Sequence, residues 1–170
     1  DELNNKIVYY EGSRGCPFNC KYCLSSTSHG VRFLDIERVK KELMYFIKKE
    51  VRLVKFVDRT FNCNHKFAMA IWEFLIEQDT KTQFHFEISA DILTDRALAI
   101  LEKMRPGLVQ LEIGVQSTHL ETIQEINRVM NIDKLREVVA KIHSFKNIHQ
   151  HLDLIAGLPF EDYKTFQKSF

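Results

Sequence analysis

Short runs rich in β-branched and aromatic residues alternate along the chain with longer stretches of helical periodicity, and this alternation constrains the fold most. Parallel neighbouring strands need crossover connections, so five strand–helix units in series predict an α/β domain with a parallel sheet. Crossovers are right-handed, and the sheet is therefore either doubly wound or curved into part of a barrel; periodicity alone does not separate the two. The expected strands are residues 6–10, 51–57, 83–89, 108–115 and 149–155.

Apolar side chains at three- and four-residue spacing predict the helices between these strands. In the first helix Ile36, Val39 and Leu43 share one face, and Asp35 is placed to cap the N-terminus. Thr94 is the equivalent cap of the third helix, and Trp72 falls on the apolar stripe of the second. The expected helices are residues 36–50, 66–78, 93–104, 119–127, 134–145 and 162–170.

The composition is that of an ordinary globular domain, with 45% hydrophobic and 28% charged residues in a chain of 170. A formal net charge of +1 gives no electrostatic reason to expect nucleic acid or an acidic membrane as a partner. No apolar run approaches the roughly 18 residues that span a bilayer. We expect residues 1–170 to form one domain. Because the chain begins with Asp1 and ends within a helical pattern, we also expect a piece of a longer protein.

Three of the four cysteines lie close together. Cys16, Cys20 and Cys23 form a C-x3-C-x2-C loop directly after the first expected strand. A secreted disulfide framework would spread its cysteines along the chain, so the clustering indicates a metal centre. Thiolates are soft ligands that suit both zinc and iron–sulfur clusters.

The number of thiols in the loop leaves the kind of centre open. A structural zinc site usually has four protein ligands. Cys63 or a histidine could complete such a site, and the chain would then be a zinc-stabilised binding module. A cluster held by three thiolates keeps one iron open to a small molecule, which suits catalysis. A simple electron carrier would need four cysteines per cluster. By itself, Cys63 is expected to be a small buried apolar residue.

The loop also resembles a known family. With Tyr22 directly before its third cysteine and a strand directly before the loop, it is similar to the radical S-adenosylmethionine (SAM) superfamily. Residues 9–18 resemble the cobalamin-binding branch, which includes proteins like the anaerobic magnesium-protoporphyrin IX monomethyl ester cyclase. The resemblance implies a partial (β/α)6-type TIM-like barrel, of which about five βα units are present. It also implies a [4Fe–4S] cluster on Cys16, Cys20 and Cys23 whose open iron binds SAM.

The ends of the later strands carry further matching groups. Barrels bind their ligands at the carboxyl ends of the strands. Gln116 and Arg128 resemble residues of coproporphyrinogen-dehydrogenase-like radical SAM enzymes, in which the glutamine contacts SAM and the arginine holds its carboxylate. The planar guanidinium suits that task because it binds carboxylates bidentately. The SAM contacts that the resemblance implies are Tyr22, Asp58, Glu87, Gln116, Arg128 and Asp153.

Several of these residues also have a plainer interpretation. Asp58 could be a solvated helix cap, and Arg128 could be a surface charge. Glu87 lies between two apolar residues of an expected strand, where an acidic group needs a partner. His149 and His151 share one face of the last strand, and we expect them to be exposed or to face a substrate rather than to bind metal.

The resemblance implies an activity and its partners. An electron from the cluster would cleave SAM to methionine and a 5′-deoxyadenosyl radical, which abstracts hydrogen from an unknown substrate. Whether the enzyme is an oxidoreductase, a cyclase or a methyltransferase stays open. The implied partners are a small-molecule or tetrapyrrole-like substrate, a reductant such as flavodoxin or ferredoxin, and cobalamin held by a domain outside this chain. An oxygen-labile cluster implies the cytoplasm. One departure from the family is Phe160, where glycine commonly follows the proline.

Overall fold

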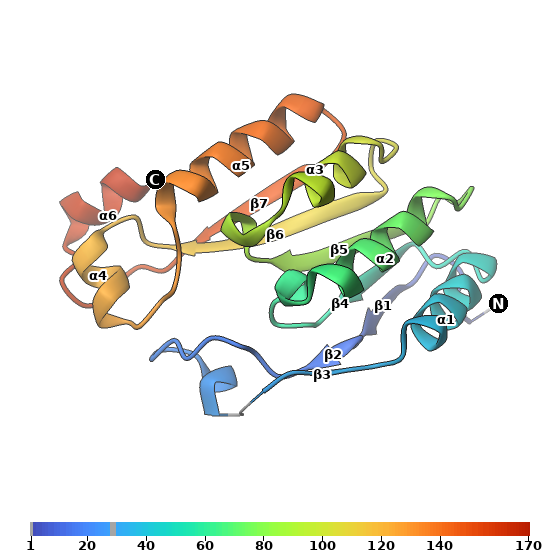
Figure 1. The fold of residues 1–170 in the computed structure, drawn as a ribbon, viewed down its shortest axis with the longest axis horizontal. Coiled ribbons are helices and arrows are strands. Elements are labelled where there is room, and N and C mark those ends of the chain that lie inside the picture. Colours follow the sequence, from blue (N-terminus) through green and yellow to red (C-terminus); the bar gives the residue numbers. More distant parts are fainter. Residues whose placement is uncertain (1, 28–29) are drawn as a thin grey trace.

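A computed structural model describes residues 2–27 and 30–170. Its centre is a five-stranded sheet in the order β1-β4-β5-β6-β7, in which all neighbouring strands run parallel. Helices connect these strands along the chain (Figure 1). The strands are β1 (Ile7–Tyr10), β4 (Leu53–Phe56), β5 (Gln83–Ile88), β6 (Val109–Gln116) and β7 (His149–Leu154).

The strand order decides between the two arrangements that the sequence leaves open. A doubly wound sheet reverses its strand order at a switch point, whereas here each strand of the sheet pairs with the one before it in the chain. Right-handed crossovers of constant direction put the connecting helices on one face. The fold is therefore a partial TIM-like barrel, and the predicted fold class is confirmed.

The helices begin close to where their capping residues predict. Asp35 Oδ1 accepts a hydrogen bond from the backbone N of Arg38 at 3.1 Å, and Thr94 Oγ1 accepts one from Ala97 N at 3.2 Å. Both predicted caps are confirmed. The α-helices are α1 (Ile36–Lys48), α2 (His65–Ile76), α3 (Asp95–Glu102), α4 (Leu120–Glu125), α5 (Ile132–Phe145) and α6 (Tyr163–Ser169).

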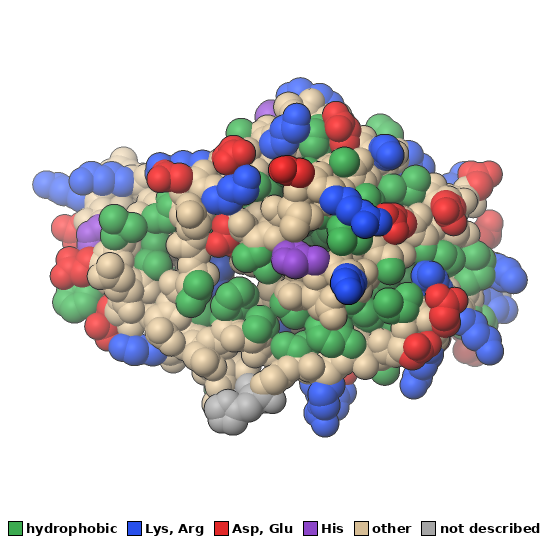
Figure 2. Space-filling model, in the orientation of Figure 1, with side chains coloured by type: hydrophobic (Ala, Val, Ile, Leu, Met, Phe, Trp, Pro, Cys, Tyr) green, Lys and Arg blue, Asp and Glu red, His purple; other side chains and the backbone are tan. Residues whose placement is uncertain are grey.

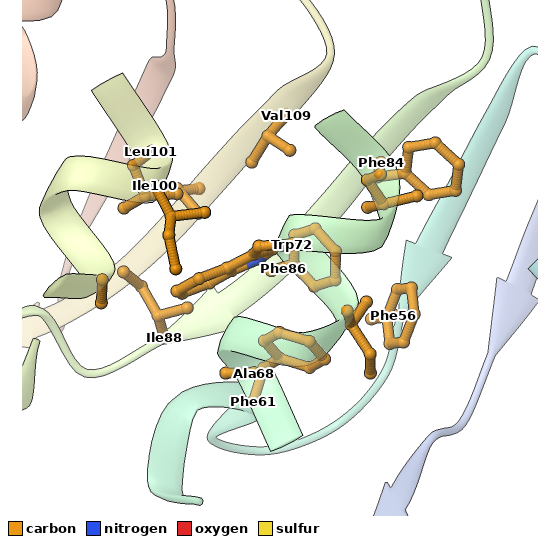
Figure 3. Packing of buried hydrophobic residues seen from close by; sticks show 14 of the residues in the cluster. Phe56, Phe61, Ala68, Trp72, Phe84, Phe86, Ile88, Ile100, Leu101 and Val109 are labelled. Atoms are coloured by element: carbon orange, nitrogen blue, oxygen red, sulfur yellow. The ribbon is translucent and has the colours of Figure 1, made fainter. Parts of the chain in front are cut away.

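The core lies between the helices and the outer face of the sheet, and aromatic rings fill its middle (Figure 3). The ring of Phe61 lies 4.3 Å from that of Phe86, 5.1 Å from Phe56 and 5.6 Å from Trp72, between centroids. All four side chains are fully buried. The prediction that Trp72 belongs to the core is confirmed, and this packing holds β4, β5 and α2 rigidly together.

Several element ends differ from the expected ones for local reasons. The second strand begins at Leu53, because Val51 N donates to Phe46 O and so belongs to the turn that ends α1. The third helix is preceded by a separate 3₁₀ turn, η3 (Ala90–Ile92). A small antiparallel ladder of β2 (Ser13–Arg14) and β3 (Arg32–Phe33) has no counterpart among the predicted elements. A pattern of two residues is too short to predict a strand.

The carboxyl ends of the strands meet at one end of the molecule. In Figure 1 this is the left side, where the cysteine loop, α4 and α6 gather. On the face that Figure 2 shows, positive and negative side chains are interspersed rather than gathered into a field of one sign. Within the described residues, no helix combines the length and the apolar character needed to cross a bilayer.

Candidate functional site

The β2–β3 ladder closes the base of the cysteine loop. Ser13 pairs with Phe33 and Arg14 with Arg32, so the chain leaves the sheet after β1 and returns before α1. Gly15 directly precedes the first cysteine and has a φ of 107°. A Cβ there would collide with the carbonyl oxygen of Gly30. Glycine is therefore required at this turn.

Asp58 fastens the entry of the loop to the end of β4. Its side chain is fully buried, and its carboxylate accepts hydrogen bonds from Gly12 N at 2.9 Å and Ser13 Oγ at 2.5 Å. Burial raises the pKa of Asp58, and the two hydrogen bonds oppose this. The interpretation of Asp58 as a solvated helix cap is wrong, because the carboxylate has no contact with solvent. Asp58 also does not line the pocket described below.

The far side of the loop is tied to the segment after α4, more than a hundred residues away in the sequence. Lys21 N donates to Ile126 O at 2.9 Å, and Lys21 Nζ pairs with Glu125 at 2.8 Å. Asn127 Nδ2 donates to Asn19 O at 2.9 Å. The loop that follows β1 is thus fixed to the α4 end of the arc.

One pocket lies between the loop and the strand ends. The thiols of Cys16, Cys20 and Cys23 line it, and the structure has no disulfide among them. Five of the six residues expected to contact SAM also line it, from the loop, from β5, β6 and β7, and from the segment after α4; only Asp58 does not. These five are Tyr22, Glu87, Gln116, Arg128 and Asp153.

A β-bulge shapes the wall that β6 contributes. The register with β7 shifts between Gly114 and Gln116, and Gln116 has a φ of 70°. An added Cβ on Gly114 would collide with Gln116 Nε2, and it would lie 3.6 Å from Arg128 Nη2. The absence of a side chain at Gly114 therefore makes room for both polar groups of the wall.

Arg128 reaches across the pocket to the cysteine loop. Its Nη2 donates to Gly114 O, and its Nη1 lies 3.4 Å from Tyr22 Oη and 3.9 Å from Cys20 Sγ. Its Nε is buried without a hydrogen-bond partner among the described residues. Burial raises the pKa of Tyr22 to about 12, although Arg128 acts against it. The interpretation of Arg128 as a free surface charge does not fit these contacts.

The acidic residues of the wall differ in their burial. Burial, followed by repulsion from Glu112, raises the pKa of Glu87. Within the described chain, no hydrogen bond or ion pair to Glu87 is found. Asp153 is exposed at the pocket edge. Glu87 thus lacks the partner that its place between two apolar residues leads one to expect.

The side chains that line the pocket can be compared with the ligands that a single metal ion or an iron–sulfur cluster requires. Among the described residues, no three cysteine, histidine or acidic side chains lie close enough to share one metal ion. A cluster gives each thiolate its own iron and so does not require three ligands around one atom. Three unpaired thiols in one pocket and an unpartnered guanidinium nitrogen beside them fit a three-thiolate cluster with a carboxylate-bearing ligand.

The sequence reasoning missed two charged residues that line the pocket, Arg59 and Glu112. Glu112 carried a signal, because it lies between two apolar residues of a strand just as Glu87 does. Arg59 carried none, since it follows β4 in a loop. Cys63 is only half-buried, so the expectation of a buried residue is not met.

Comparisons with known proteins agree on one family. A family model described as the Radical SAM superfamily matches residues 10–170. The chain is 26% identical over 170 residues to the cobalamin-dependent radical SAM methyltransferase TokK of Streptomyces tokunonensis, covering 93% of this chain and 24% of TokK. It is 22% identical over 171 residues to the anaerobic magnesium-protoporphyrin IX monomethyl ester cyclase of Rubrivivax gelatinosus, covering 99% of this chain and 30% of the cyclase.

A solved structure has the same fold. The radical SAM methyltransferase TsrM from Kitasatospora setae, with tryptophan substrate and a SAM analogue bound, superposes with a TM-score of 0.82. The match covers 98% of this chain and 33% of TsrM, at 12% sequence identity. The chain thus spans only about a quarter to a third of the length of these proteins.

Proposed function

The chain belongs to the radical SAM superfamily, and from this premise we propose that residues 1–170 form a catalytic core domain that cleaves SAM reductively at a [4Fe–4S] cluster. One observation carries the proposal: three thiols outside any disulfide and five polar residues, three of them on the strands β5, β6 and β7, line the same pocket at the carboxyl ends of the sheet. Such a position is where barrels assemble their active sites.

The thiols of Cys16, Cys20 and Cys23 would hold three irons and leave the fourth open. The loop that carries them is fixed at both sides, by Asp58 at its entry and by the Lys21 and Asn127 contacts at its far side. Fixed ligands hold a cluster in one orientation and limit its loss. The chain's own share of the chemistry is therefore positioning.

Polar residues of the pocket would bind and orient SAM. The Arg128 guanidinium has a buried Nε that still lacks a partner, and a carboxylate is the ligand that such a planar fork binds best. Gln116 is turned toward the pocket by the bulge, and Glu87, Tyr22 and Asp153 offer further polar groups around it. Asp58 enters this proposal only as the anchor of the loop.

When bound and reduced, the cluster supplies the electron that cleaves the carbon–sulfur bond of SAM, giving methionine and a 5′-deoxyadenosyl radical that abstracts hydrogen from the substrate. Two relatives support the wider setting. TokK is named as cobalamin-dependent and as a methyltransferase, and the cyclase acts on a tetrapyrrole. On this basis we include a cobalamin domain outside this chain and a small-molecule or tetrapyrrole-like substrate in the proposal.

Two further elements complete the proposal. A reductant such as flavodoxin or ferredoxin would deliver the electron, and an oxygen-labile cluster would need the reducing cytoplasm. The zinc-stabilised binding module is not favoured, because the family model covers residues 10–170 and the superposed structure is an enzyme of the radical SAM type.

SAM cleavage tests the proposal. The chain is reconstituted anaerobically with iron and sulfide and incubated with SAM and dithionite, and 5′-deoxyadenosine and methionine are measured by chromatography. The Cys16→Ala/Cys20→Ala/Cys23→Ala triple variant should form neither product. Cys63→Ala is the matched control and should cleave SAM as the wild type does. If the wild type forms no more 5′-deoxyadenosine than the triple variant, the proposal is wrong.

A further inference from the structure

A charged cluster lies on the inner face of the sheet, below the cysteine loop. Lys55 on β4 pairs in register with His85 on β5, and Glu87, two residues further along β5, pairs with Glu112 on β6. Side chains of registered positions share a face. Glu112 lies two residues before Gly114, about 7 Å deeper along the strand at the usual rise per residue. This layer is separate from the groups assigned above to SAM, except for Glu87.

Glu112 is held from two sides through the same oxygen. His85 Nε2 lies 3.0 Å from Glu112 Oε2, and Lys55 Nζ lies 3.6 Å from that oxygen. The lysine pair is too long for a hydrogen bond. In the described part of the chain no partner of Oε1 is found, and the residue lines the pocket. Glu112 thus presents one oriented carboxylate oxygen to the pocket.

His85 makes the orientation of Glu112 specific. Its side chain is 6% exposed, and burial, followed by the charge of Lys55, lowers the pKa of the imidazole. A neutral imidazole that donates from Nε2 leaves Nδ1 as an acceptor, and Nδ1 is buried without a partner among the described residues. The buried His85 thus orients the Glu112 carboxylate through Nε2, while its own Nδ1 is left without a hydrogen bond.

The neighbouring carboxylate decides which ligand fits. Glu87 is the registered neighbour of Glu112 and lines the same pocket, without a hydrogen bond or ion pair in the described residues. Lys55, the cation paired with Glu112, does not line the pocket, whereas Arg59, whose charge acts on Glu87, does. Two adjacent carboxylates with open acceptor oxygens favour a cation that donates several hydrogen bonds, and an ammonium has three donors.

On the basis of the proposed function, we propose that Glu112, oriented by His85, binds a protonated amine of the substrate at the floor of the pocket. Glu112 is the contact residue, His85 is a positioning residue, and Lys55 is a cation that competes with the amine for Glu112. The substrate would be an amine-bearing small molecule rather than a carboxylate or a hydrocarbon. SAM carries an ammonium of its own, so the test must separate these two sources.

The probes are n-propylammonium and propionate, titrated into the chain at low salt and followed by ligand-observed NMR. Propylammonium should bind saturably and propionate should not. Glu112→Gln should weaken the binding of propylammonium at least tenfold, whereas Glu77→Gln, a change of an exposed glutamate, should leave it unchanged. Equal binding of the two probes, or unchanged binding by Glu112→Gln, overturns the proposal.

A second variant gives an effect of opposite sign. Lys55→Met removes the cation that competes for Glu112 and should tighten propylammonium binding severalfold, which general damage to the fold would not do. Unchanged or weaker binding by Lys55→Met contradicts the proposal.

Two further arms separate this proposal from the proposed function. The cluster-free triple cysteine variant should still bind propylammonium, because Glu112, His85 and Lys55 do not depend on the thiols. A chain that cleaves SAM but binds no propylammonium refutes the amine site alone. In the cluster-loaded chain, SAM should not displace propylammonium. Displacement would assign Glu112 to the ammonium of SAM and overturn the substrate assignment.

Discussion

Replacing Asp58 should loosen the cysteine loop, and the size of the effect follows from its two hydrogen bonds. Hydrogen bonds to a charged group contribute about 1.5–3 kcal/mol each. Asp58→Ala leaves Gly12 N and Ser13 Oγ buried without an acceptor, while it also removes the cost of a buried charge. We expect the free energy of unfolding to fall by about 3 kcal/mol.

Asp58→Asn should cost much less. The amide oxygen can accept from Gly12 N, and the amide NH₂ can donate to Ser13 Oγ, because a hydroxyl both donates and accepts. Only the charge of the acceptor is lost, so we expect a decrease of about 1 kcal/mol. The wild type should therefore be the most stable, Asp58→Asn the next and Asp58→Ala the least stable, and this order follows from the hydrogen-bond geometry.

The contribution of Asp58 to the free energy of unfolding should change with pH in one direction. Burial raises the pKa of Asp58 in the folded state. The group therefore contributes stability that is present at low pH and is lost as the pH rises through the folded-state pKa. Asparagine does not titrate. The stability difference between wild type and Asp58→Asn should thus widen as the pH is lowered from above the folded-state pKa toward the unfolded-state value of about 3.9.

Urea unfolding followed by circular dichroism measures these differences in stability. Iron content after reconstitution measures whether the cysteine loop still holds its cluster. Asp58→Ala should retain less iron than the wild type, whereas Asp79→Asn, an exposed acid, should match the wild type in both measurements. If Asp58→Ala unfolds at the same urea concentration as the wild type, the anchoring role of Asp58 is refuted.

Three other substitutions test separate parts of the structure. Gly15→Ala places a Cβ against Gly30 O at a φ of 107° and should reduce iron content by more than half, as an iron assay would show; full iron content would contradict the turn geometry. Gly114→Ala collides only with the flexible end of Gln116, so stability should change by less than about 1 kcal/mol. SAM affinity, measured by equilibrium dialysis, should fall about tenfold; unchanged affinity would remove Gln116 from the SAM site. Phe61→Ala should lower the free energy of unfolding by about 4 kcal/mol in a urea titration, and a loss below about 1 kcal/mol would contradict the packing of Phe61.

The parts of the fold that local patterns determine could be predicted from the sequence. Asp35 and Thr94 cap their helices through backbone groups three residues away, and Trp72 is buried because its helix is amphipathic. Five strand–helix units gave the parallel sheet. Whether this sheet was wound or curved depends on which strands pair, and no local pattern contains that information.

The groups that shape the site were harder to predict because they depend on contacts distant in sequence. Asp58 meets Gly12 across 46 residues, and Asn127 meets Asn19 across 108. Neither pair has a spacing that a sequence pattern could reveal. Phe160 shows the reverse case: it occupies the place where the family commonly has glycine, and its φ of 61° is of the kind that glycine adopts freely.

Whether the three loop thiols hold a [4Fe–4S] cluster is tested most directly by the visible absorption spectrum of the chain after anaerobic reconstitution with iron and sulfide. The wild type and the Cys63→Ala variant should be brown, with a broad band that the Cys16→Ala/Cys20→Ala/Cys23→Ala variant lacks. A colourless wild-type protein that holds stoichiometric zinc would contradict the radical SAM assignment of the site and favour a structural metal instead.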